Sequence, residues 1–453
     1  MSHRGSRTLR LGALARVEGE AALHLTIRDR AVVETKLGIY EPPRFFEAFL
    51  VGRGHHEPPD ITARICGICP VAYQMTSCQA IERACGVTVD GAIADLRRLL
   101  YLGEWIESQA LHIHLLHAPD FLGYPSAVEL AREQRPAVER GLRVKQAGNA
   151  IMEQIGGRAI HPVNIRLGGF HRVPARAELD PLVERLRRAH DDALETVRWV
   201  SGFDFPDARY DGQLLALCDP GRYAIDSGRP TVMDAAEDAP AERDASVRSF
   251  SVADFEQHVV ERQVRHSTAL VSELDGRHHL TGSLARFALS GRWLHPSALA
   301  AAREAGLGDP TDGAVCRNPF RSIVVRAVEV THAVAEALRL IESYDPPARP
   351  YTDVPPRRAT GCAATEAPRG LLYHRYDIDT DGSLRTVRLV PPTAQNQAAI
   401  EHDLRCQVQR RLDAPGAPPS DGELTTLCER AVRNHDPCIS CSAHFLDLTV
   451  DQR

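Results

Sequence analysis

Nine residues near the end of the chain, Asp436-Pro437-Cys438-Ile439-Ser440-Cys441-Ser442-Ala443-His444, contain two cysteines at C-x-x-C spacing. An acid precedes the pair and an imidazole follows it. Two thiolates this close hold a soft metal ion from one side and leave it half-coordinated. The only other C-x-x-C pair of the sequence lies near the opposite end, in Arg64-Ile65-Cys66-Gly67-Ile68-Cys69-Pro70. We therefore expect the fold to bring both ends of the chain to one site.

The length and composition are those of an ordinary globular protein. The chain has 453 residues, of which 43% are hydrophobic and 25% are charged. The formal net charge of -6 is small for this size and argues against a role on nucleic acid or at a membrane surface. No apolar run approaches the ~20 residues of a membrane-spanning helix, and no signal peptide is evident. Eleven cysteines in such a chain indicate reduced thiols. We therefore expect a cytoplasmic protein without a membrane span.

The spacing of apolar residues predicts an α+β fold that is mainly helical, with a long central helix bundle and peripheral β-hairpins. Residues 20–27 and 31–40 form one predicted hairpin. Residues 371–390 form another, which turns at Asp381-Gly382. The predicted helices cover residues 44–51, 71–85, 92–118, 136–155, 181–200, 252–262, 328–344, 396–412 and 423–434.

Four cysteines in two pairs are also the usual donors of a structural zinc site. Zinc ribbons keep their two pairs roughly 15–20 residues apart, however, whereas these pairs stand near opposite ends of the chain. A zinc ion that joins the two ends remains an alternative. Iron–sulfur clusters use local cysteine runs of other spacings. The remaining seven cysteines form no cluster pattern, and we expect them to be small buried hydrophobic residues.

The two cysteine motifs resemble the two signatures of the large subunit of nickel–iron hydrogenases. The resemblance runs over nearly the whole chain, from Arg16-Val17-Glu18-Gly19 to His444. The segment Cys69-Pro70-Val71-Ala72-Tyr73-Gln74-Met75 is most similar to the cytoplasmic, NAD(P)-linked branch, which includes the sulfhydrogenases. The resemblance implies the fold of that subunit, together with the reversible heterolytic cleavage of H2 into protons and electrons.

The resemblance gives each cysteine a role at a Ni-Fe(CO)(CN)2 centre. Cys66 and Cys438 match terminal ligands of nickel, and Cys69 and Cys441 match ligands that bridge nickel and iron. Four thiolates make a soft, electron-rich site, and a terminal thiolate can serve as a base. Glu18 matches the family glutamate that takes the proton from the position of Cys438. From the residues alone, a solvated carboxylate at a strand edge is the favoured interpretation of Glu18.

The resemblance also implies a magnesium ion and a cation beside the centre. Glu47 and His444 match two ligands of a structural magnesium, with a backbone carbonyl from residues 392–395 as a third. Magnesium prefers oxygen ligands, so the imidazole depends on the resemblance alone. Arg369 matches an arginine whose guanidinium lies over the metals and can hold cyanide nitrogens. Without the resemblance, Arg369 is a surface arginine of a hairpin.

Further residues match positions around the metals. Pro392 and Thr393 match a segment that donates hydrogen bonds to a cyanide, and Asp436 matches an acid next to the terminal thiolate. His161 lies in the family's Gly-Gly-basic-x-x-His-Pro segment, where it is structural or supports the ligands. Tyr73 departs from the pattern, because many relatives have a histidine there that hydrogen-bonds a bridging thiolate. A phenol can donate the same bond but is not a cation near neutral pH.

We interpret residues 1–444 as one hydrogenase large-subunit domain. Within it we distinguish a strand-rich part (residues 8–60), a helical core (64–202), a surface excursion (219–248) rich in Pro, Ala and Asp, and a C-terminal β-hairpin with the metal motif (366–444). In the family, a dedicated protease removes everything after the histidine once nickel is inserted. We therefore expect the tail, residues 445–453, to be removed on maturation.

The sequence contains no dinucleotide-binding glycine motif after a strand, no P-loop and no cluster-binding cysteine run. Electrons must therefore leave through partners. The resemblance implies a small subunit with iron–sulfur clusters, diaphorase subunits that carry flavin and bind NAD(P), a maturation protease and nickel-insertion factors. A deazaflavin or ferredoxin is the alternative acceptor. A homologue of the quinone-site subunit of respiratory complex I is a less favoured alternative, because that branch has lost the cysteine pairs.

Overall fold

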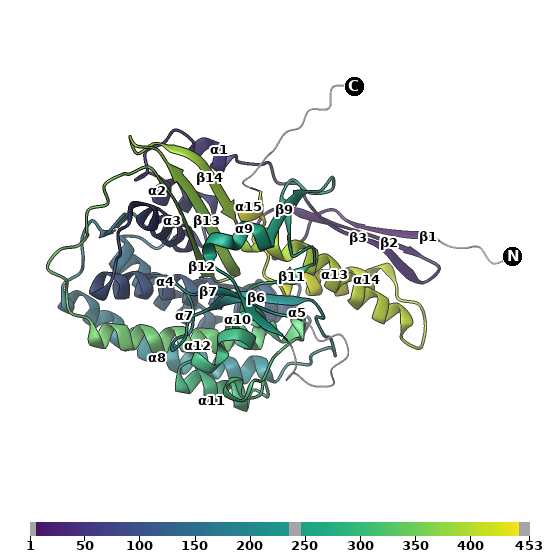
Figure 1. Cartoon of the computed structure of the whole chain (residues 1–453). Helices are drawn as coiled ribbons and strands as arrows, with labels where there is room; N and C mark the ends of the chain where they lie inside the picture. The colour runs from purple at the N-terminus through teal and green to yellow at the C-terminus, as the bar shows by residue number, and fades with distance from the viewer. Residues whose placement is uncertain (1–5, 235–245, 444–453) are drawn as a thin grey trace, which may run out of the picture.

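The computed structural model describes residues 6–234 and 246–443, which form a helical core with sheets around it (Figure 1). The α-helices are α1 Phe46–Leu50, α2 Pro58–Thr62, α3 Pro70–Cys85, α4 Gly91–Leu111, α5 Ala118–Leu122, α6 Ala127–Glu133, α7 Arg135–Gly156, α8 Arg176–Ser201, α9 Phe255–His258, α10 Ser283–Ser290, α11 Pro296–Glu304, α12 Ser322–Ser343, α13 Pro392–Asp413, α14 Asp421–Arg433 and α15 Ile439–Ser442. The strands are β1 Ser6–Leu11, β2 Ala21–Arg28, β3 Ala31–Ile39, β4 Ile165–Arg166, β5 Gly169–Phe170, β6 Gln213–Cys218, β7 Arg229–Met233, β8 Val247–Ser249, β9 Val259–Gln263, β10 Leu270–Leu274, β11 His279–Leu280, β12 Ala359–Ala367, β13 Gly370–Ile378 and β14 Leu384–Val390.

Four long helices form the centre of the molecule. Helix α4 contacts α7 and α12, and α8 contacts the same two helices, so the four make a closed bundle (Figure 1). Helix α12 is buried on nearly all sides, as its run of valines and alanines requires. The predicted helical bundle is confirmed, although a π-helix, His112–His117, interrupts the long helix predicted for residues 92–118.

Helix α3 carries the first cysteine motif at its start and packs against a three-stranded sheet. Pro70 occupies the first turn of α3, where its missing N–H costs no hydrogen bond. The sheet has the order β12-β13-β14, and both β12 and β13 contact α3. The hairpin predicted for residues 371–390 is confirmed as β13 and β14, with β12 as an additional strand that the sequence did not indicate.

A second hydrophobic core joins the two ends of the chain. The inward side chains of β2, Leu23, Leu25 and Ile27, are buried against apolar residues of α13 and α14. The alternation of buried and partly buried residues along β2 confirms the predicted first hairpin. Beyond this sheet, Glu18 forms an isolated parallel bridge with Cys438. The N-terminal segment and the C-terminal motif are therefore neighbours.

Two predictions were wrong in part. The helix predicted for residues 252–262 ends at His258: residues 252–258 are helical, whereas residues 259–263 pair as β9 with β10. The two strands follow each other in the sequence, at residues 259–263 and 270–274, but the apolar spacing of the first one alone does not show the pairing. The predicted surface excursion at 219–248 contains the strand β7, which pairs with β6, and Tyr223 and Ile225 are buried. Its polar composition comes mainly from residues 234–245, most of which lie outside the described residues.

Other predicted boundaries differ less from those of the structure. Helix α12 begins at Ser322, six residues before the predicted start at 328, because the preceding turn of the helix is equally apolar. The predicted boundary at residue 366 falls inside β12. In the described part of the chain, no helix is long and apolar enough to cross a membrane. His444 and the tail 445–453 lie outside the described residues.

Candidate metal centre

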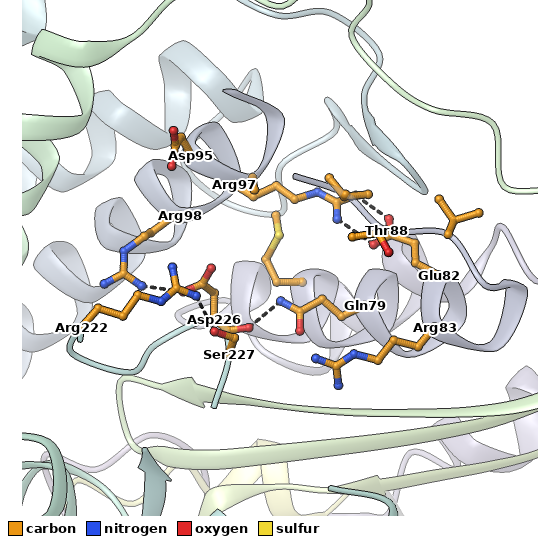
Figure 2. Close-up of a pocket in the computed structure, with 14 residues that line it drawn as sticks. Gln79, Glu82, Arg83, Thr88, Asp95, Arg97, Arg98, Arg222, Asp226 and Ser227 are labelled. Carbon is orange, nitrogen blue, oxygen red and sulfur yellow. Dashed lines mark hydrogen bonds and ion pairs between the residues drawn. The ribbon is translucent and has the colours of Figure 1, made fainter. Parts of the chain in front are cut away.

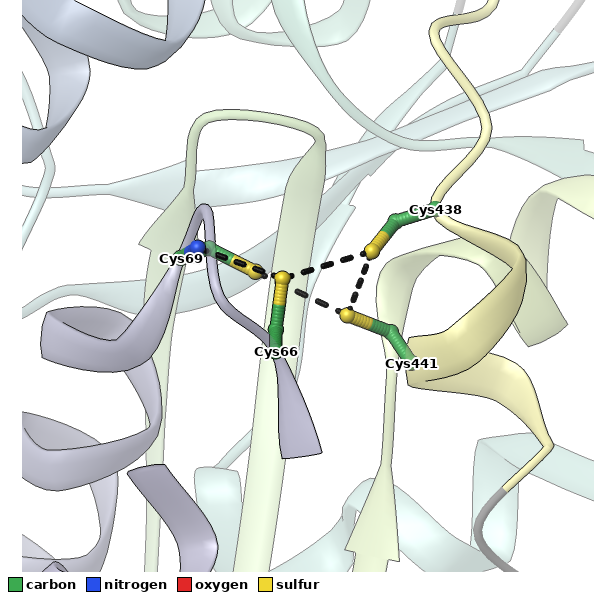
Figure 3. Close-up of side chains that lie close together, drawn as sticks. All are labelled: Cys66, Cys69, Cys438 and Cys441. Carbon is green, nitrogen blue, oxygen red and sulfur yellow. Dashed lines mark hydrogen bonds between the residues drawn. The ribbon is translucent and has the colours of Figure 1, made fainter. Parts of the chain in front are cut away.

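The four cysteines of the two C-x-x-C motifs meet in the interior (Figure 3). All four side chains are buried, and their sulfur atoms lie within 4.8 Å of one another. The Sγ atoms are 3.5 Å apart between Cys66 and Cys438, and 3.6 Å apart between Cys69 and Cys441. Burial raises the pKa of Cys438, whereas hydrogen bonds from the neighbouring thiols lower the pKa of Cys66. The cluster thus provides soft donors in an interior that excludes water.

The backbone around the first motif supports an anionic sulfur. The N–H groups of Ile68 and Cys69 donate to Sγ of Cys66 at 3.3 and 3.2 Å. The buried carboxylate of Glu104, on α4, accepts hydrogen bonds from the N–H groups of Val71 (2.6 Å) and Ala72 (3.1 Å) in the first turn of α3. These donors have no partner within their own helix. Glu104 therefore fixes the start of α3, and with it the position of Cys69, but no sequence motif indicated it.

Glu18 lies against the second motif. Its Oε2 atom is 3.1 Å from Sγ of Cys438 and accepts a hydrogen bond from the N–H of Ser440 at 3.0 Å. The next residue, Gly19, has φ +86°, and a Cβ atom there would come within 2.6 Å of the Ile439 side chain. Only glycine permits this close approach. The structure therefore places Glu18 at a cysteine and not at a solvated strand edge.

Arg44 connects the two cysteine motifs, and sequence reasoning missed it. Its guanidinium donates to the carbonyl of Ile65 at 2.7 Å and to the carbonyl of Ser440. Its backbone N–H donates to the carbonyl of Ala443 at 3.1 Å. The only local feature is the preceding Pro42-Pro43, which says nothing about such distant partners.

Arg369 and Asp436 form a buried pair beside the cysteines. Arg369 stands in the turn between β12 and β13, and its Nη2 atom lies 3.4 Å from Oδ1 of Asp436. Its Nη1 donates to Oγ of Ser108 at 3.3 Å. Burial lowers the pKa of Arg369, but the Asp436 carboxylate and the cysteine thiolates more than offset it and raise this pKa well above its ordinary value. Arg369 is therefore a buried permanent cation and not a surface residue of the hairpin.

The other predicted residues surround this group at different distances. Helix α13 begins at Pro392, and Oγ1 of Thr393 accepts a hydrogen bond from the N–H of Cys438 at 2.9 Å. Tyr73 is fully buried, and burial together with the charges of Cys441 and Cys69 raises its pKa well above the ordinary value, so it stays a neutral phenol. His161 is partly exposed, has φ 50°, and accepts a hydrogen bond at its carbonyl from Arg158.

Glu47 lies away from the cysteines, on α1. One carboxylate oxygen accepts a hydrogen bond from the N–H of Leu389 at 2.6 Å, and the other lies 3.9 Å from Arg388. Burial raises the pKa of Glu47 to about 7. Its predicted partner in a magnesium site, His444, lies outside the described residues.

A cavity of about 280 Å³ lies elsewhere, between α3, α4 and the segment that precedes β7 (Figure 2). Two of its arginines are neutralised within the cavity wall. Arg97 makes two hydrogen bonds to Glu82, at 2.9 and 2.7 Å, and Arg98 donates to Asp226 at 2.5 Å. The cavity contains no cysteine, and we regard the cysteine cluster as the candidate centre.

Comparison with known proteins decides the family. The family model of the nickel-dependent hydrogenases matches residues 44–155 and 328–444. The alpha subunit of sulfhydrogenase 1 of Pyrococcus furiosus is 32% identical over 443 residues, which cover 96% of this chain and 97% of the relative. The chain belongs to the nickel-dependent hydrogenases. The resemblance of its motifs to large subunits of nickel–iron hydrogenases is thereby confirmed, and the chain is an oxidoreductase.

Other hydrogenases are similar at lower identity. A subunit of an F420-non-reducing hydrogenase of Methanococcus voltae is 24% identical, over 97% of this chain and 95% of the relative. Among solved structures, an NAD+-reducing [NiFe]-hydrogenase in the H2-reduced state matches with a TM-score of 0.85 and 26% identity, over 97% of this chain and 99% of that one. A [NiFeSe]-hydrogenase of Dm. baculatum, 20% identical with a TM-score of 0.77, shares the fold. The predicted α+β fold of a hydrogenase large subunit is confirmed.

Proposed function

We propose that this hydrogenase chain is a catalytic subunit that holds a Ni-Fe(CO)(CN)2 centre with Cys66, Cys69, Cys438 and Cys441. The observation that carries the proposal is the convergence of four buried sulfur atoms, from both ends of the chain, within 4.8 Å. This donor set suits soft metals. A single zinc ion could use the same sulfurs, but the membership in the nickel-dependent family favours nickel and iron. When bound, the centre supplies the redox chemistry that splits H2.

Glu18 is the proposed proton acceptor. Its Oε2 atom lies 3.1 Å from Sγ of Cys438, within the range of direct proton transfer. The hydrogen bond from the N–H of Ser440 to the same oxygen fixes the carboxylate in this orientation. A proton on the Cys438 sulfur can therefore move to Oε2 of Glu18 and leave the centre on the side of the N-terminal segment.

Some buried polar atoms beside the cysteines lack a hydrogen bond within the described residues, so they can bind additional ligands of the metal centre. Nε and Nη2 of Arg369 and Oδ2 of Asp436 are such atoms. A buried donor without a partner costs free energy, so a small anionic ligand such as cyanide has a place beside Arg369. The Oγ1 atom of Thr393 faces the same region through its bond to Cys438. The neutral phenol of Tyr73 offers a hydrogen bond but no charge near Cys441.

We also propose a magnesium ion at Glu47. The carboxyl is buried, and Arg388 comes no closer than 3.9 Å; burial outweighs Arg388 and the Leu389 N–H and raises the pKa of Glu47 to about 7, which supports a further cation beside it. A divalent cation would supply this positive charge, with His444 and a carbonyl of residues 392–395 as the other proposed ligands. The role of His161 is a structural one near the first motif.

The proposed electron path leads to NAD(P). The chain's similarity to the sulfhydrogenase of Pyrococcus furiosus and to an NAD+-reducing hydrogenase supports this acceptor. A cytoplasmic complex with diaphorase subunits and a small iron–sulfur subunit is the corresponding proposal, matured by a protease and nickel-insertion factors. A deazaflavin or ferredoxin is the second candidate, because the alpha subunit of a hydrogenase for coenzyme F420, which is a deazaflavin, is also similar.

An infrared spectrum of the chain purified with its partners tests the centre. Iron-bound carbonyl and cyanide stretches, with one nickel per chain, are the expected result. One zinc per chain without these bands would replace the proposal by the zinc alternative. Where the bands appear, H2-dependent reduction of NAD+, NADP+, ferredoxin and a deazaflavin, compared at equal concentrations, identifies the acceptor.

A further inference from the structure

A second group of metal-binding side chains lies away from the four cysteines. It consists of Asp211, just before β6, His278, just before β11, and His402 in the middle of α13. One potential ligand atom from each lies within 4.8 Å of the others. Helix α13 runs beside β11, so three separate segments meet here (Figure 1). The Nε2 atom of His402 lies 2.7 Å from Oδ1 of Asp211. The two imidazole rings stack with their centroids 4.1 Å apart, so one ring has to turn before a nitrogen of each can point at the same ion.

Cys406 can complete the donor set, although its sulfur is not among the atoms that all lie within 4.8 Å of one another and has to move closer to bind the same ion. It follows His402 by four residues on α13, a spacing that puts both side chains on one face of a helix. Its Sγ atom lies 3.5 Å from Nε2 of His402. A tetrahedral zinc ion, with bonds of about 2.0 Å to nitrogen and 2.3 Å to sulfur, also separates such atoms by about 3.5 Å. The Asp211–His402 contact has to widen from its hydrogen-bond length by about 0.6 Å to admit the ion.

The surroundings hold the His278 ring in one orientation. Its Nδ1 atom is 3.0 Å from the hydroxyl of the buried Tyr210, which leaves Nε2 as the nitrogen available to a metal. A metal-bound histidine commonly has such a partner on its other nitrogen. A Cβ atom on Gly212 would come within 2.3 Å of the Tyr210 hydroxyl and 2.6 Å of the His278 ring. The loop at residue 212 thus packs directly on this pair.

The loop itself is fixed to the rest of the molecule. The N–H of Tyr210 donates to the carbonyl of Arg317 at 2.8 Å, and the Arg317 guanidinium donates to the carbonyl of Gly212 at 2.9 Å. The backbone on both sides of Asp211 is therefore held in place. Asp211 remains open to solvent, with 63% of its side chain exposed, so an ion can enter from outside.

We propose that Asp211, His278, His402 and Cys406 form a second metal site, which binds Zn2+. Two imidazoles, one carboxylate and one thiolate are a donor set of intermediate softness that this ion prefers. The ion joins α13 to the loop before β6 and to the turn before β11. The start of the same helix carries Thr393, which contacts the backbone of Cys438. The site does not depend on the proposed function, because it shares no residue with the cysteine cluster.

Cobalt provides the test, because tetrahedral Co2+ is coloured and replaces Zn2+ in such sites. The complete complex, with its nickel and iron in place and loosely bound metal removed by a chelator, is titrated with Co2+. We expect one Co2+ per chain, with visible bands of tetrahedral geometry and a near-ultraviolet sulfur-to-cobalt band, all abolished by one equivalent of Zn2+. In Cys406→Ser the sulfur-to-cobalt band disappears. In Asp211→Asn the affinity falls more than about 100-fold, because even outer partners of a metal ligand contribute about 10–100-fold.

Controls separate this site from the cysteine cluster and from folding defects. Arg405→Gln changes an exposed residue of the same helix, and Cys362→Ser removes another partly exposed cysteine. Both should bind Co2+ like the wild type. Because Asp211 is largely exposed, Asp211→Asn tests the site in a folded chain. Tyr210→Phe should weaken binding about 10-fold through the orientation of His278. Equal Co2+ binding by wild type and Asp211→Asn, or wild-type spectra without a sulfur band, would overturn the proposal.

Discussion

Two buried clusters of charge lie side by side around the turn between β12 and β13, and they differ in how completely their polar atoms are hydrogen-bonded. In the first, Arg286 bonds both oxygens of Glu329, at 2.7 and 2.9 Å, and one oxygen of Glu366 at 3.2 Å. It also donates to the carbonyls of Ala367 and Pro368. The N–H of Leu217 donates to the other carboxylate oxygen of Glu366. In the second cluster, Arg369 and Asp436 retain atoms without a hydrogen bond within the described residues.

The difference separates a structural network from a binding site. A buried group that lacks a partner costs about 1–3 kcal/mol, so the Arg369 cluster is incomplete without a ligand. The Arg286 network is complete and fixes the turn from which Arg369 projects. Changes in the first cluster should therefore reduce stability, and changes around the second should reduce activity.

The largest effect is expected at the cysteines. Cys438→Ser replaces a soft thiolate by a hard hydroxyl that stays protonated, so nickel should be lost and H2 turnover should fall more than about 1,000-fold. Metal analysis and H2-dependent dye reduction measure both. Cys85→Ser, outside the cluster, is the control and should retain its nickel. A Cys438→Ser chain with full nickel and turnover would contradict the assignment.

The second largest effect is expected in the Arg286 network, on the free energy of unfolding. Arg286→Met leaves two carboxylates buried without their cation and should reduce the free energy of unfolding by about 3–5 kcal/mol. Urea unfolding of the purified complex measures it. The double variant Arg286→Met/Glu329→Leu should recover part of the loss, because one uncompensated charge is removed as well. A stable single variant with low turnover would reverse our interpretation of the two clusters.

Arg369→Lys should show the opposite behaviour. A lysine keeps the charge but loses the planar donors, so turnover should fall about 100-fold, while the free energy of unfolding changes by less than about 1 kcal/mol. The shift of the cyanide stretches in the infrared spectrum gives a second readout beside the ligand. Unchanged stretches together with unchanged turnover would place the guanidinium away from the metals.

Structural features that leave a local pattern in the sequence could be predicted from it. Helices such as α7 and α13 follow from apolar spacing, and the four cysteines follow from their pairs. Glu18 and Arg369 needed the family resemblance, since nothing local distinguishes them from surface residues. Glu104, Arg44 and the Arg286 network were missed because each contact connects residues far apart in sequence. Strand β9 was mistaken for the end of a helix because its pairing with the next strand, β10, overrides the local spacing of apolar residues.

The second group of metal-binding residues shows a related limit. Cys406 was interpreted as a buried hydrophobic residue, and it is only partly buried beside His402. The i, i+4 spacing of His402 and Cys406 is visible in the sequence. Asp211 and His278 come from distant segments, however, and only the fold brings them to this helix.

The smallest effect is expected at Glu336 of α12, which we compare with Glu329 of the same helix. Glu329 is fully buried in the Arg286 network, whereas Glu336, two turns later, is 14% exposed and pairs with Arg98 at 3.2 Å. Burial acts to raise the pKa of Glu336, but the hydrogen bond from Arg339 and the charge of Arg98 outweigh it and lower this pKa to about 2. Its stabilising contribution is therefore present above the ordinary pKa of about 4.5 and lost as pH falls toward 2.

At pH 6, Glu336→Gln should reduce the free energy of unfolding by about 1–2 kcal/mol, a value discounted for partial exposure. At pH 3 the wild-type carboxyl of the unfolded chain is already protonated, so the difference between wild type and variant should shrink. Urea unfolding at both pH values measures it, with Glu342→Gln on the same helix as the control. A difference that stays constant between pH 6 and pH 3 would mean that the Arg98 pair contributes by packing and not by charge, as a partly exposed ion pair can. On α12, only the fully buried Glu329 would then stabilise the fold through its charge. Burial alone would explain the difference between Glu329 in the Arg286 network and Glu336 beside Arg98.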